Sequence, residues 1–541
     1  METEDKNALA DEQPEVQPDV EAQAPEQPEV VAEADGTAVA TKPYKGFAAK
    51  LDNFFGIRKR GSSFRAEIIG GLVTFMAMVY ILPVNAGMLS ATGPSSGAIY
   101  IATALSAVVG TMLMAFLARM PLAQASGMGL NAFFTYTICF GFGLSYANAL
   151  LLVLIDGVVF IILTLTGLRK VLFNAIPKVV RVAIPAGIGL FIAFLGLQNV
   201  HLVVNDDATL VNLASFNVLP ASMGGSATWG SIAPLLVTVV GLITVAILSK
   251  KKVKGAMLYS ILGGAALYWI FMAIGYGAGD AACKTIIDEF TITNPIDAFK
   301  DWGNQSVGQV FANGFNFDGY LATHNGGSLA LVIITSALAF CMVDMFDTMG
   351  TLYGACARGN MLEKDGSIPN INKSMLCDAI ATTTGAVFGT STVTTFVESS
   401  SGIGAGARTG FAALITGACF AVAMFLSPIA DMIPSAATSI ALIYVGVLMM
   451  NCVREIEWTD AAEAVPAFLT IAMMPFTYNI SYGIAFGIIS WLVIKAVLML
   501  VDLCGKKKAT TADTVAQPAE KINIVTIVIA VLFLLMFFLT H

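Results

Sequence analysis

The stretch "SLALVIITSALAFCMVDMFDTMGTLYGACA", residues 328–357, carries two aspartates within an otherwise charge-free run. The run is long enough to cross a lipid bilayer, for which ~20 apolar residues suffice. Asp344 and Asp347 fall near its middle, where an ionised side chain costs at least ~2.5–3.5 kcal/mol. Acids at this depth usually face a cavity or bind a substrate, ion or proton. The stretch therefore indicates a membrane protein with a polar site inside it.

The composition extends this interpretation to most of the chain. Of 541 residues, 56% are hydrophobic and only 12% are charged, and the mean hydropathy is +0.77, whereas soluble domains carry roughly 25% charged residues. The pattern predicts a polytopic membrane protein. Charge-poor runs of helical length lie near 66–90, 97–117, 123–141, 146–167, 182–200, 231–249, 256–278, 328–354, 374–390, 392–407, 408–428, 436–452, 464–478 and 480–501, with a further apolar run at 522–540.

The charges of the connecting loops predict the orientation. Positive residues cluster in alternate loops, at Arg119, Arg169, Lys170, Lys178, Arg181, Lys250, Lys251, Lys252, Lys254, Arg358, Lys364, Lys373, Arg408, Arg454 and Lys506 to Lys508. The intervening loops carry no Lys or Arg, except the long loop 279–327. The positive-inside rule then puts the N-terminus in the cytoplasm of a multi-pass protein in the cell (plasma) membrane.

The two halves of the chain resemble each other. "IPKVVRVAIPAGIGLFIAFLG", residues 176–196, aligns with "IPSAATSIALIYVGVLMMNC" from Ile433, with Ile-Pro and a Gly twelve residues later in register. Each half has seven spans, an odd number, so the halves must lie inverted in the membrane. Inverted repeats are typical of transporters, with the site at the repeat interface near the midplane.

These observations divide the chain into five segments. Residues 1–43 are rich in Glu, Pro, Gln and Ala and predict a disordered acidic tail, without the basic and apolar regions of a signal peptide. Residues 44–278 form the first seven-span repeat and 279–327 an extracytoplasmic loop. Residues 328–502 form the second, inverted repeat, and 503–541 a basic linker with an extra apolar segment.

The cysteines and histidines do not suggest metal chemistry. The eight cysteines mostly lie within or beside apolar spans and show neither a disulfide framework nor a metal spacing. The three histidines are not in an HExxH context. We therefore expect no metal site and no cofactor.

A second anomaly surrounds Glu398 in "GTSTVTTFVESSSGIGAGARTG", residues 389–410. Glu398 is the only charge there before Arg408, among Thr, Ser and Gly. Such residues permit extended backbone at membrane depth only where protein or a cavity covers it. The following "SGIGAGA" is expected to start a half-helix whose N-terminal amides face the same cavity.

The corresponding part of the first half is "MPLAQASGMGLNAFFTYT", residues 120–137. Asn131 and Gln124 are candidate hydrogen-bonding groups. Phe133 or Phe134 could stack on a flat ligand, although packing is the commoner role of any single aromatic residue.

Two further acids lie in apolar runs. Asp156, in "LLVLIDGVVF", has no evident partner, and a structural role and a proton-path role both remain open. Asp378 sits close to a predicted helix start, where an acid complements the helix dipole.

Two carboxylates and an amide in an apolar slot restrict the ligand. An anion would be repelled, and a metal cation would call for histidines or more acids. A flat neutral heterocycle fits better, because carboxylates accept its N–H bonds, an amide complements its carbonyl and an aromatic ring covers its face. Two nearby acids also favour proton binding, since like charges share a proton.

Four motifs together resemble the AzgA-like purine permeases of the nucleobase:cation symporter family 2. They are "GLVTFMAMVYILPVNAGMLSATG" at 71–93, "QASGMGLNAFF" at 124–134, "VDMFDTMGTLYG" at 343–354 and "TFVESSSGIGAGARTG" at 395–410. The resemblance runs from about residue 50 to 500.

The resemblance implies an all-α, uracil-permease-like fold of about fourteen spans in two inverted seven-span repeats. Spans one to four and eight to eleven would form a core domain, and the others a gate domain. The third and tenth spans would begin as extended segments that meet near the midplane.

The resemblance also implies the site. Asp344 and Glu398 would hydrogen-bond a purine base, and Asn131 would help set specificity. Asp347 is similar to a position implicated in function, and contact with substrate and contact with the proton both remain open for it. Beyond the resemblance, our own hypothesis is that Asp347, Asp344 or Glu398 carries the coupled proton. The expected substrate-binding set is completed by Gln124, Phe133, Phe396 and Ser399.

We therefore expect a secondary active transporter that imports hypoxanthine, guanine or adenine by proton symport and alternating access. The alternatives are an anion (sulfate-type) transporter or a pyrimidine/xanthine transporter of the same fold, and a regulated channel or receptor. An enzyme is not expected, because neither HExxH nor GxSxG occurs in a span. Expected partners are the purine, protons and the lipid bilayer, with no nucleic acid; a homodimer remains open.

Overall fold

The structure is a computed structural model that describes residues 30–32, 38–40, 45–168, 176–217, 227–363, 367–504 and 522–539. Most of the predicted acidic tail and of the basic linker lies outside these residues. The tail contributes one described pair of antiparallel strands, β1 (Val30–Ala32) and β2 (Ala38–Ala40).

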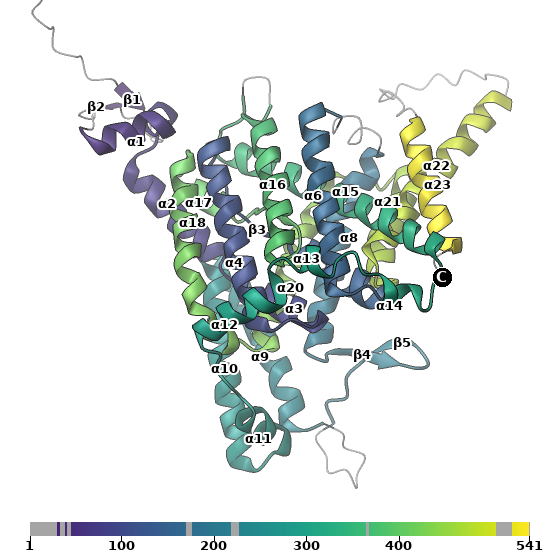
Figure 1. The fold of residues 1–541 in the computed structure, drawn as a ribbon, viewed down its shortest axis with the longest axis horizontal. Helices are drawn as coiled ribbons and strands as arrows, with labels where there is room; N and C mark the ends of the chain where they lie inside the picture. Colours follow the sequence, from purple (N-terminus) through teal and green to yellow (C-terminus); the bar gives the residue numbers. More distant parts are fainter. Residues whose placement is uncertain are drawn as a thin grey trace, which may run out of the picture.

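The described residues are mostly helical (Figure 1). The helices of the first half are α1 (Phe47–Phe55), α2 (Phe64–Met78), α3 (Ile81–Leu89), α4 (Ser96–Leu113), α5 (Met128–Ala132), α6 (Tyr146–Thr166), α8 (Lys178–Asn199), α9 (Trp229–Lys250) and α10 (Ala256–Ala278). The loop between the halves holds α11 (Ala281–Asp288), α12 (Pro295–Asp301), α13 (Gln309–Ala312) and α14 (Asp318–Leu321).

The second half has the corresponding set. Its helices are α15 (Gly326–Arg358), α16 (Ile371–Phe388), α17 (Ser399–Gly404), α18 (Gly410–Ala423), α19 (Ser427–Asp431), α20 (Ser435–Met449), α21 (Ala461–Phe476), α22 (Ile480–Cys504) and α23 (Ile524–Leu539). Two further strand pairs are β3 (Gln124–Ser126) with β6 (Val393–Thr395) and β4 (Val203–Asp206) with β5 (Leu210–Leu213).

Within the described residues, ten helices are long and apolar enough to cross a membrane. They are Phe64–Thr92, Ser96–Ala118, Tyr146–Thr166, Lys178–Asn199, Trp229–Lys250, Ala256–Ala278, Gly326–Arg358, Gly410–Asp431, Ser435–Glu455 and Ile480–Val501. Four other expected spans fall short of this measure. Two are broken into a strand and a short helix at β3–α5 and β6–α17, α16 is less apolar, and α21 is short.

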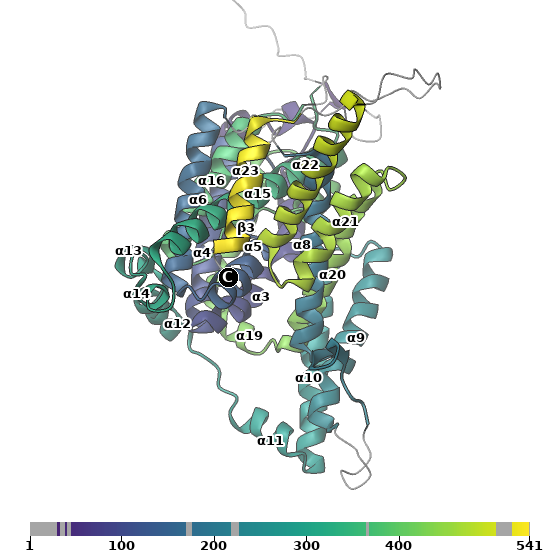
Figure 2. The ribbon, with the colours of Figure 1, turned by 90° about the vertical axis from the view of Figure 1, so that its right-hand side faces the viewer.

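The spans pack into two groups, which we call the core group and the gate group. The core group consists of α2, α3, α4, α6, α15, α16, α17 and α18, which contact one another extensively; the gate group consists of α8, α9, α10, α20, α21 and α22. Figure 2 shows α6, α16 and α4 on one side and α20, α9 and α10 on the other. These memberships match the core and gate domains that the family resemblance implies.

The two halves contact each other through α8 and α20, the helices that follow the aligned Ile-Pro pairs of the sequence repeat. Gly189 of α8 and Gly446 of α20, the register-matched glycines of the repeat, lie against each other. A Cβ added at Gly446 would stand 2.4 Å from the Gly189 carbonyl oxygen. Only the absence of side chains allows this approach of the two backbones. Equivalent helices therefore contact each other, as expected for inverted halves related by a two-fold axis.

The last apolar helix, α23, links the two groups. It packs against α15 of the core group and α22 of the gate group, with Phe533 fully buried and Phe537 edge-on to Tyr482 at 5.3 Å. Figure 1 shows it at the edge of the bundle. At 16 residues it is shorter than the ten long spans.

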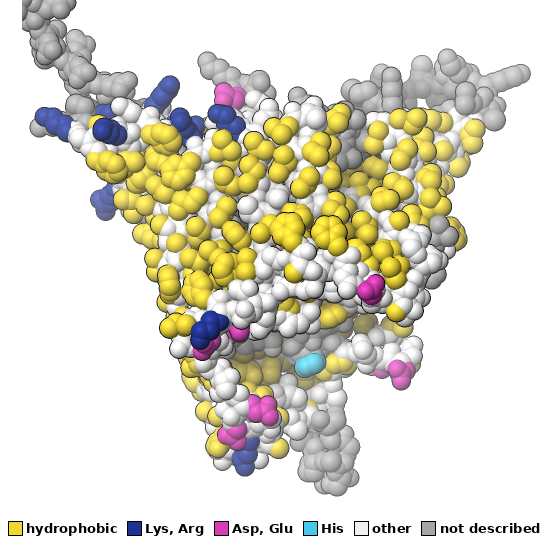
Figure 3. All heavy atoms as spheres, viewed as in Figure 1, with side chains coloured by type: hydrophobic (Ala, Val, Ile, Leu, Met, Phe, Trp, Pro, Cys, Tyr) yellow, Lys and Arg dark blue, Asp and Glu magenta, His cyan; other side chains and the backbone are white. Residues whose placement is uncertain are grey.

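The surface has the apolar belt of a membrane protein. Large hydrophobic side chains are exposed on the outward helices, such as Ile243 of α9, Ile270 of α10 and Phe468 of α21. Figure 3 shows a broad hydrophobic band, with many of the Lys and Arg side chains at the end that carries α1. The helix α11 and the β4–β5 hairpin lie at the opposite end (Figure 1). We call these ends the α1 side and the α11 side.

One buried carboxylate ties the first span to the eleventh. Glu67 of α2 is fully buried, and its carboxylate accepts hydrogen bonds from the backbone N–H groups of Arg408 (2.8 Å), Thr409 (3.3 Å) and Ala412 (3.1 Å). These amides lie at the start of α18, where the first N–H groups have no acceptor in a preceding helical turn, and the Ala412 N–H also donates to the Thr409 carbonyl at 3.2 Å. Glu67 thus acts as a cap supplied by a distant helix.

We expect Glu67→Ala to destabilise the protein strongly, because each buried amide left without a partner costs ~1–3 kcal/mol. Glu67→Gln keeps one acceptor oxygen and should lose less. The measurement is the thermal unfolding midpoint in detergent, with Asp207→Ala, at an exposed loop residue, as the control. A Glu67→Ala midpoint equal to that of the control would show that the cap is not needed.

Candidate functional site

The site is built on two extended segments that lie side by side inside the bundle. We call their antiparallel pairing the β3–β6 crossing. Strands β3 and β6 pair antiparallel, with Ala125 opposite Thr394. The pairing continues beyond the strands, because Phe396 N–H donates to the Ala123 carbonyl and Gly127 N–H to the Thr392 carbonyl, both at 3.0 Å. All six strand residues are buried. Each segment thus satisfies the backbone groups that a helix would have satisfied internally.

A small cavity of about 80 Å³, which we call the site cavity, lies beside this crossing. It is enclosed by β6 and the start of α5 and α17, by α15, and by the gate helix α20. Its lining residues are Tyr80, Gly127, Met128, Gly129, Asp347, Thr351, Thr394, Thr395, Phe396, Val397, Glu398, Val445 and Met449. The site cavity therefore lies between the core group and the gate group.

Two carboxylates face this cavity, and each is held by a neighbouring hydroxyl. Tyr80 Oη donates to Glu398 Oε1 at 2.6 Å, and Thr394 Oγ1 donates to Asp347 Oδ2 at 3.3 Å. Glu398 and Asp347 are both partly exposed to the cavity. The lining contains no Lys, Arg or His. The arrangement therefore offers hydrogen-bond acceptors to a ligand that carries N–H groups, or to a proton.

Three of the residues predicted from the sequence line the cavity, namely Asp347, Glu398 and Phe396. Asp344 does not. It is three residues before Asp347 on α15, on the neighbouring helix face, and its side chain is fully buried. In this conformation a ligand in the cavity does not reach Asp344.

The remaining predicted residues do not line the site cavity, and they lie next to the two extended segments. Gln124 is buried and its amide donates to Asp378 Oδ1 at 2.9 Å. Ser399 Oγ accepts the Ala123 N–H at 3.0 Å. Phe133 is buried against Phe340, with ring centroids 4.7 Å apart.

Asn131 is also buried behind the site cavity. Its side-chain oxygen accepts hydrogen bonds from the hydroxyls of Ser126, at 2.9 Å, and Ser391. Its side-chain nitrogen has no partner among the described residues. Asn131 thus connects α5 to both extended segments, and neither N–H of its amide has a partner among the described residues.

The sequence predicted that the amides at the start of α17 face the cavity, but the first of these amides have acceptors within the chain. The N–H groups of Ser399, Ser400 and Ser401 already donate to the carbonyls of Phe396, Val397 and Glu398, at 3.2, 3.0 and 2.9 Å. These amides form the hydrogen bonds of the tight turn at Glu398, so they are not free to bind another group. Recognition at this place therefore depends on the side chains.

Asp378 differs from its expected role as a dipole partner at a helix start. It lies in the second turn of α16, fully buried, and accepts hydrogen bonds from Gln124, from Thr348 at 2.8 Å and from Thr395 at 3.3 Å. Among the described residues, no group of three or more His, Cys, Asp or Glu side chains is arranged to hold a metal ion.

The site cavity communicates with larger cavities on the α1 side. A cavity of about 550 Å³ shares Asp347, Val397 and Glu398 with it and extends to Arg358 at the end of α15. A second cavity, of about 770 Å³, runs from Glu398 to Lys252 and Arg358. Arg358 donates to Ser400 Oγ at 2.9 Å on this route.

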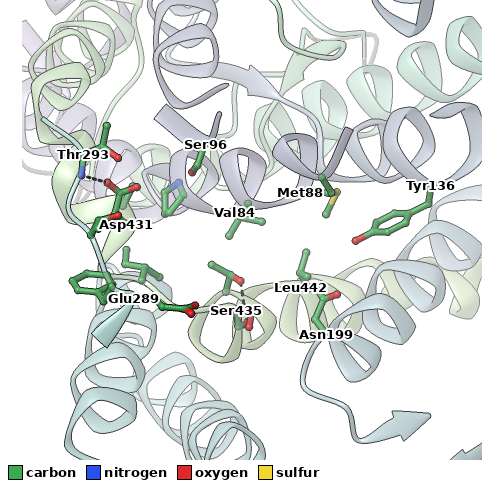
Figure 4. A pocket seen from close by; sticks show the side chains of 18 residues that line it. Val84, Met88, Ser96, Tyr136, Asn199, Glu289, Thr293, Asp431, Ser435 and Leu442 are labelled. Carbon is green, nitrogen blue, oxygen red and sulfur yellow. Dashed lines mark hydrogen bonds between the residues drawn. The ribbon is translucent and has the colours of Figure 1, made fainter. Parts of the chain in front are cut away.

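A separate cavity of about 620 Å³ lies on the α11 side and shares no lining residue with the site cavity. Figure 4 shows Val84, Met88 and Tyr136 facing Asn199 and Leu442 across it. The chain after α11 crosses its mouth, where Thr293 N–H donates to Asp431 Oδ2 at 2.9 Å.

Ten of the thirteen lining residues of the site cavity were not among the residues predicted from the sequence, and two of these, Tyr80 and Thr394, donate hydrogen bonds to its carboxylates. Tyr80 is 2% exposed, in the middle of the first span. A tyrosine hydroxyl buried at that depth needs a hydrogen-bond partner. This requirement could have identified Tyr80 as a candidate site residue from the sequence. Thr394 is one of many hydroxyl residues in its segment, and no local pattern distinguishes it.

Comparison with known proteins defines the class. Residues 65–486 match the model of the permease family, so the chain belongs to that family. This confirms the resemblance drawn from the four motifs, and the protein is a multi-pass membrane protein.

Two named relatives are more specific. The chain is 37% identical over 446 residues to the guanine/hypoxanthine permease PbuO of Bacillus subtilis, covering 82% of this chain and 94% of that one. It is 34% identical over 445 residues to the adenine permease AdeP of Escherichia coli, covering 82% and 90% of the two chains.

Solved structures confirm the fold. The structure of murine Slc26a9, an anion transporter in the inward-facing state, matches with a TM-score of 0.53 at 12% identity, covering 85% of this chain and 73% of that one. At this identity the similarity concerns the fold alone.

The connection between cavities predicts which side of the membrane reaches the site. In a background without native cysteines, we expect Val397→Cys to react with a membrane-impermeant thiol reagent applied from the α1 side, because Val397 is 50% exposed in the connected cavities. Ser391→Cys, at a fully buried position, is the control and should not react. Reaction of Val397→Cys from the α11 side alone would contradict the assigned route.

Proposed function

We propose that this permease is a secondary active transporter that imports purine nucleobases, namely hypoxanthine, guanine or adenine, by proton symport. The observation that carries the proposal is the pair of carboxylates, Glu398 and Asp347, facing one small cavity between the core and gate groups. Named relatives that cover most of the chain are guanine/hypoxanthine and adenine permeases, which supports the same substrate class.

The chemistry of the cavity suits a purine. Glu398 and Asp347 can accept N–H groups of the ring, and Tyr80 fixes the orientation of the Glu398 carboxylate through its hydrogen bond. Phe396 and Met449 give the cavity apolar walls for the faces of the ring. Asn131 would influence specificity from behind by holding the β3–β6 crossing in place.

The remaining predicted residues receive indirect roles in this proposal. Gln124 and Ser399 position the two extended segments, and Phe133 packs behind them. Asp344, buried one helical turn from Asp347, fits proton coupling better than direct contact with the base. Glu398 and Asp347 would exchange protons with water in the cavity.

Transport would proceed by alternating access. The core group carries the extended segments, Glu398 and Asp347, and would move against the gate helices α8 and α20. With the N-terminus in the cytoplasm of a plasma-membrane protein, the α1 side is cytoplasmic, and the connected cavities correspond to an inward-open state.

The alternative of an anion transporter is disfavoured by the same residues. Slc26a9 shares the fold and transports anions, but the present site cavity has two acids and no Lys, Arg or His in its lining. A negative substrate would meet like charges there. Charge does not distinguish a purine transporter from a pyrimidine or xanthine transporter, because those substrates are not anions of the sulfate type. The competition of unlabelled bases with labelled hypoxanthine distinguishes them.

The proposal predicts a defined uptake pattern. In purine-transport-deficient cells, labelled hypoxanthine should accumulate, and a protonophore should abolish accumulation because the proton gradient drives it. Unlabelled adenine or guanine should compete, while uracil, xanthine and sulfate should not. Competition by sulfate alone, or the absence of purine uptake in well-expressed protein, would refute the proposal.

Glu398 should contribute more than Tyr80. Removing a hydrogen bond to a charged group costs about 1.5–3 kcal/mol, so we expect Glu398→Gln to weaken hypoxanthine binding by roughly 10–150-fold. Tyr80→Phe removes only the orienting hydrogen bond and should weaken binding by less. The exposed Glu457→Gln is the control. The measurement is equilibrium binding to purified protein, and unchanged affinity in Glu398→Gln would remove Glu398 from the site.

A further inference from the structure

Three buried acids meet inside the core group, away from the site cavity. Asp156 of α6, Asp344 of α15 and Asp378 of α16 are each fully buried. Asp344 interacts electrostatically with both of the others, and Asp156 with Asp378. None of the three lines the site cavity or the cavities connected to it on the α1 side. We call these residues the acid triad.

The three carboxyls differ in how they are satisfied. Asp378 accepts hydrogen bonds from Gln124, Thr348 and Thr395. By contrast, neither oxygen of Asp156 has a hydrogen-bond partner among the described residues, and the carboxyl of Asp344 has only the carboxyl of Asp378 as a partner. A buried carboxylate without donors is very costly, and such a group avoids the cost by binding a proton. Asp156 and Asp344 therefore have the environment of proton-binding groups.

No positive charge compensates the acid triad. The titratable groups that interact with it from the surrounding helices are Asp347 and Cys341 of α15 and Cys377 of α16. Asp347 in turn interacts with Glu398. Lys, Arg and His are absent from these described interactions, and the triad is not arranged as a metal site. The proton is thus the ligand that this environment fits.

The acid triad also has a connection to the substrate. Asp347, which faces the site cavity, lies one turn from Asp344 on α15, and the two carboxyls interact. The acids therefore form a connected sequence that begins at the cavity, because Asp347 interacts with Asp344 and Asp378, and both of these interact with Asp156. Thr348 and Thr395 add hydroxyls beside Asp378.

We propose that Asp156 is a proton-binding residue of the transport cycle, reached from the site cavity through Asp347, Asp344 and Asp378. The inference rests on the proposed function. In each cycle one carboxylate of the sequence takes a proton from water on one side of the membrane, becomes a neutral acid, and releases that proton as a carboxylate on the other side. Protonation neutralises that one carboxylate before the core group moves with a neutral purine.

A purely structural Asp156 makes a different prediction. A permanently protonated acid takes no part in coupling, so the neutral amide of Asn should replace it without effect on the energetics of transport. A coupled Asp156 cannot be replaced in this way, because the amide binds no proton. The two roles therefore separate when exchange and accumulation are measured side by side.

The experiment uses the full chain in proteoliposomes and compares wild type, Asp156→Asn and Asp156→Glu. The matched control is Asp207→Asn, at an exposed loop residue. Two readouts are taken, namely exchange of labelled for unlabelled hypoxanthine without a gradient, and accumulation driven by a pH gradient. For Asp156→Asn we expect retained exchange but an inside-to-outside ratio that falls to unity. Asp156→Glu should restore accumulation, and the control should behave as wild type.

Other outcomes contradict the inference. Accumulation by Asp156→Asn with the wild-type pH dependence would give Asp156 a structural role only. If Asp156→Asn does not fold, Asp156→Glu decides, because a moved proton site shifts the pH dependence of accumulation and an unchanged dependence overturns the proposal. Accumulation driven by a sodium gradient alone would also overturn it. Absence of purine exchange in wild type would instead refute the proposed function.

Discussion

The rest of the structure depends on how two extended segments satisfy their backbone hydrogen bonds at membrane depth. Neither β3 nor β6 has water or a helix ladder available, so each uses the other. This pairing joins the two halves of the chain at one place and ends each strand where a short helix begins. It leaves a break in both spans, and the site cavity lies beside this break. The position of the site thus follows from a requirement of the backbone.

The same arrangement gives the acids different surroundings, because some of them line the cavity and others are buried inside the core group. Asp347 and Glu398 lie at the surface of the cavity, where hydroxyls of Thr394 and Tyr80 and a ligand can bind them. Asp344 is only three residues from Asp347, but on the neighbouring face of α15, and is packed inside the core group. One helical turn therefore separates an acid that lines the cavity from an acid that is fully buried.

The sequence predicted those parts of the fold that depend on local composition and on the repeat. The apolar runs and the broken spans near Gln124 and Glu398 agree with the structure. The glycines that the repeat matches in register, Gly189 and Gly446, lie against each other in the folded chain. Most lining residues of the site cavity could not be predicted from the local sequence pattern. The side of α15 that faces the cavity depends on the packing of neighbouring helices, so Asp344 and Asp347 could not be distinguished. Tyr80 comes from a span more than 300 residues from Glu398, and their hydrogen bond is visible only in the folded chain.

The central claim is that the cavity beside the β3–β6 crossing holds the purine. It is tested most directly by an experimental structure of the purified protein with hypoxanthine bound. The account predicts density for the base between the core and gate groups, with its N–H groups within hydrogen-bonding distance of Glu398 or Asp347 and its ring near Phe396. Density in the cavity of the α11 side alone, or a base that contacts neither carboxylate, would contradict the account.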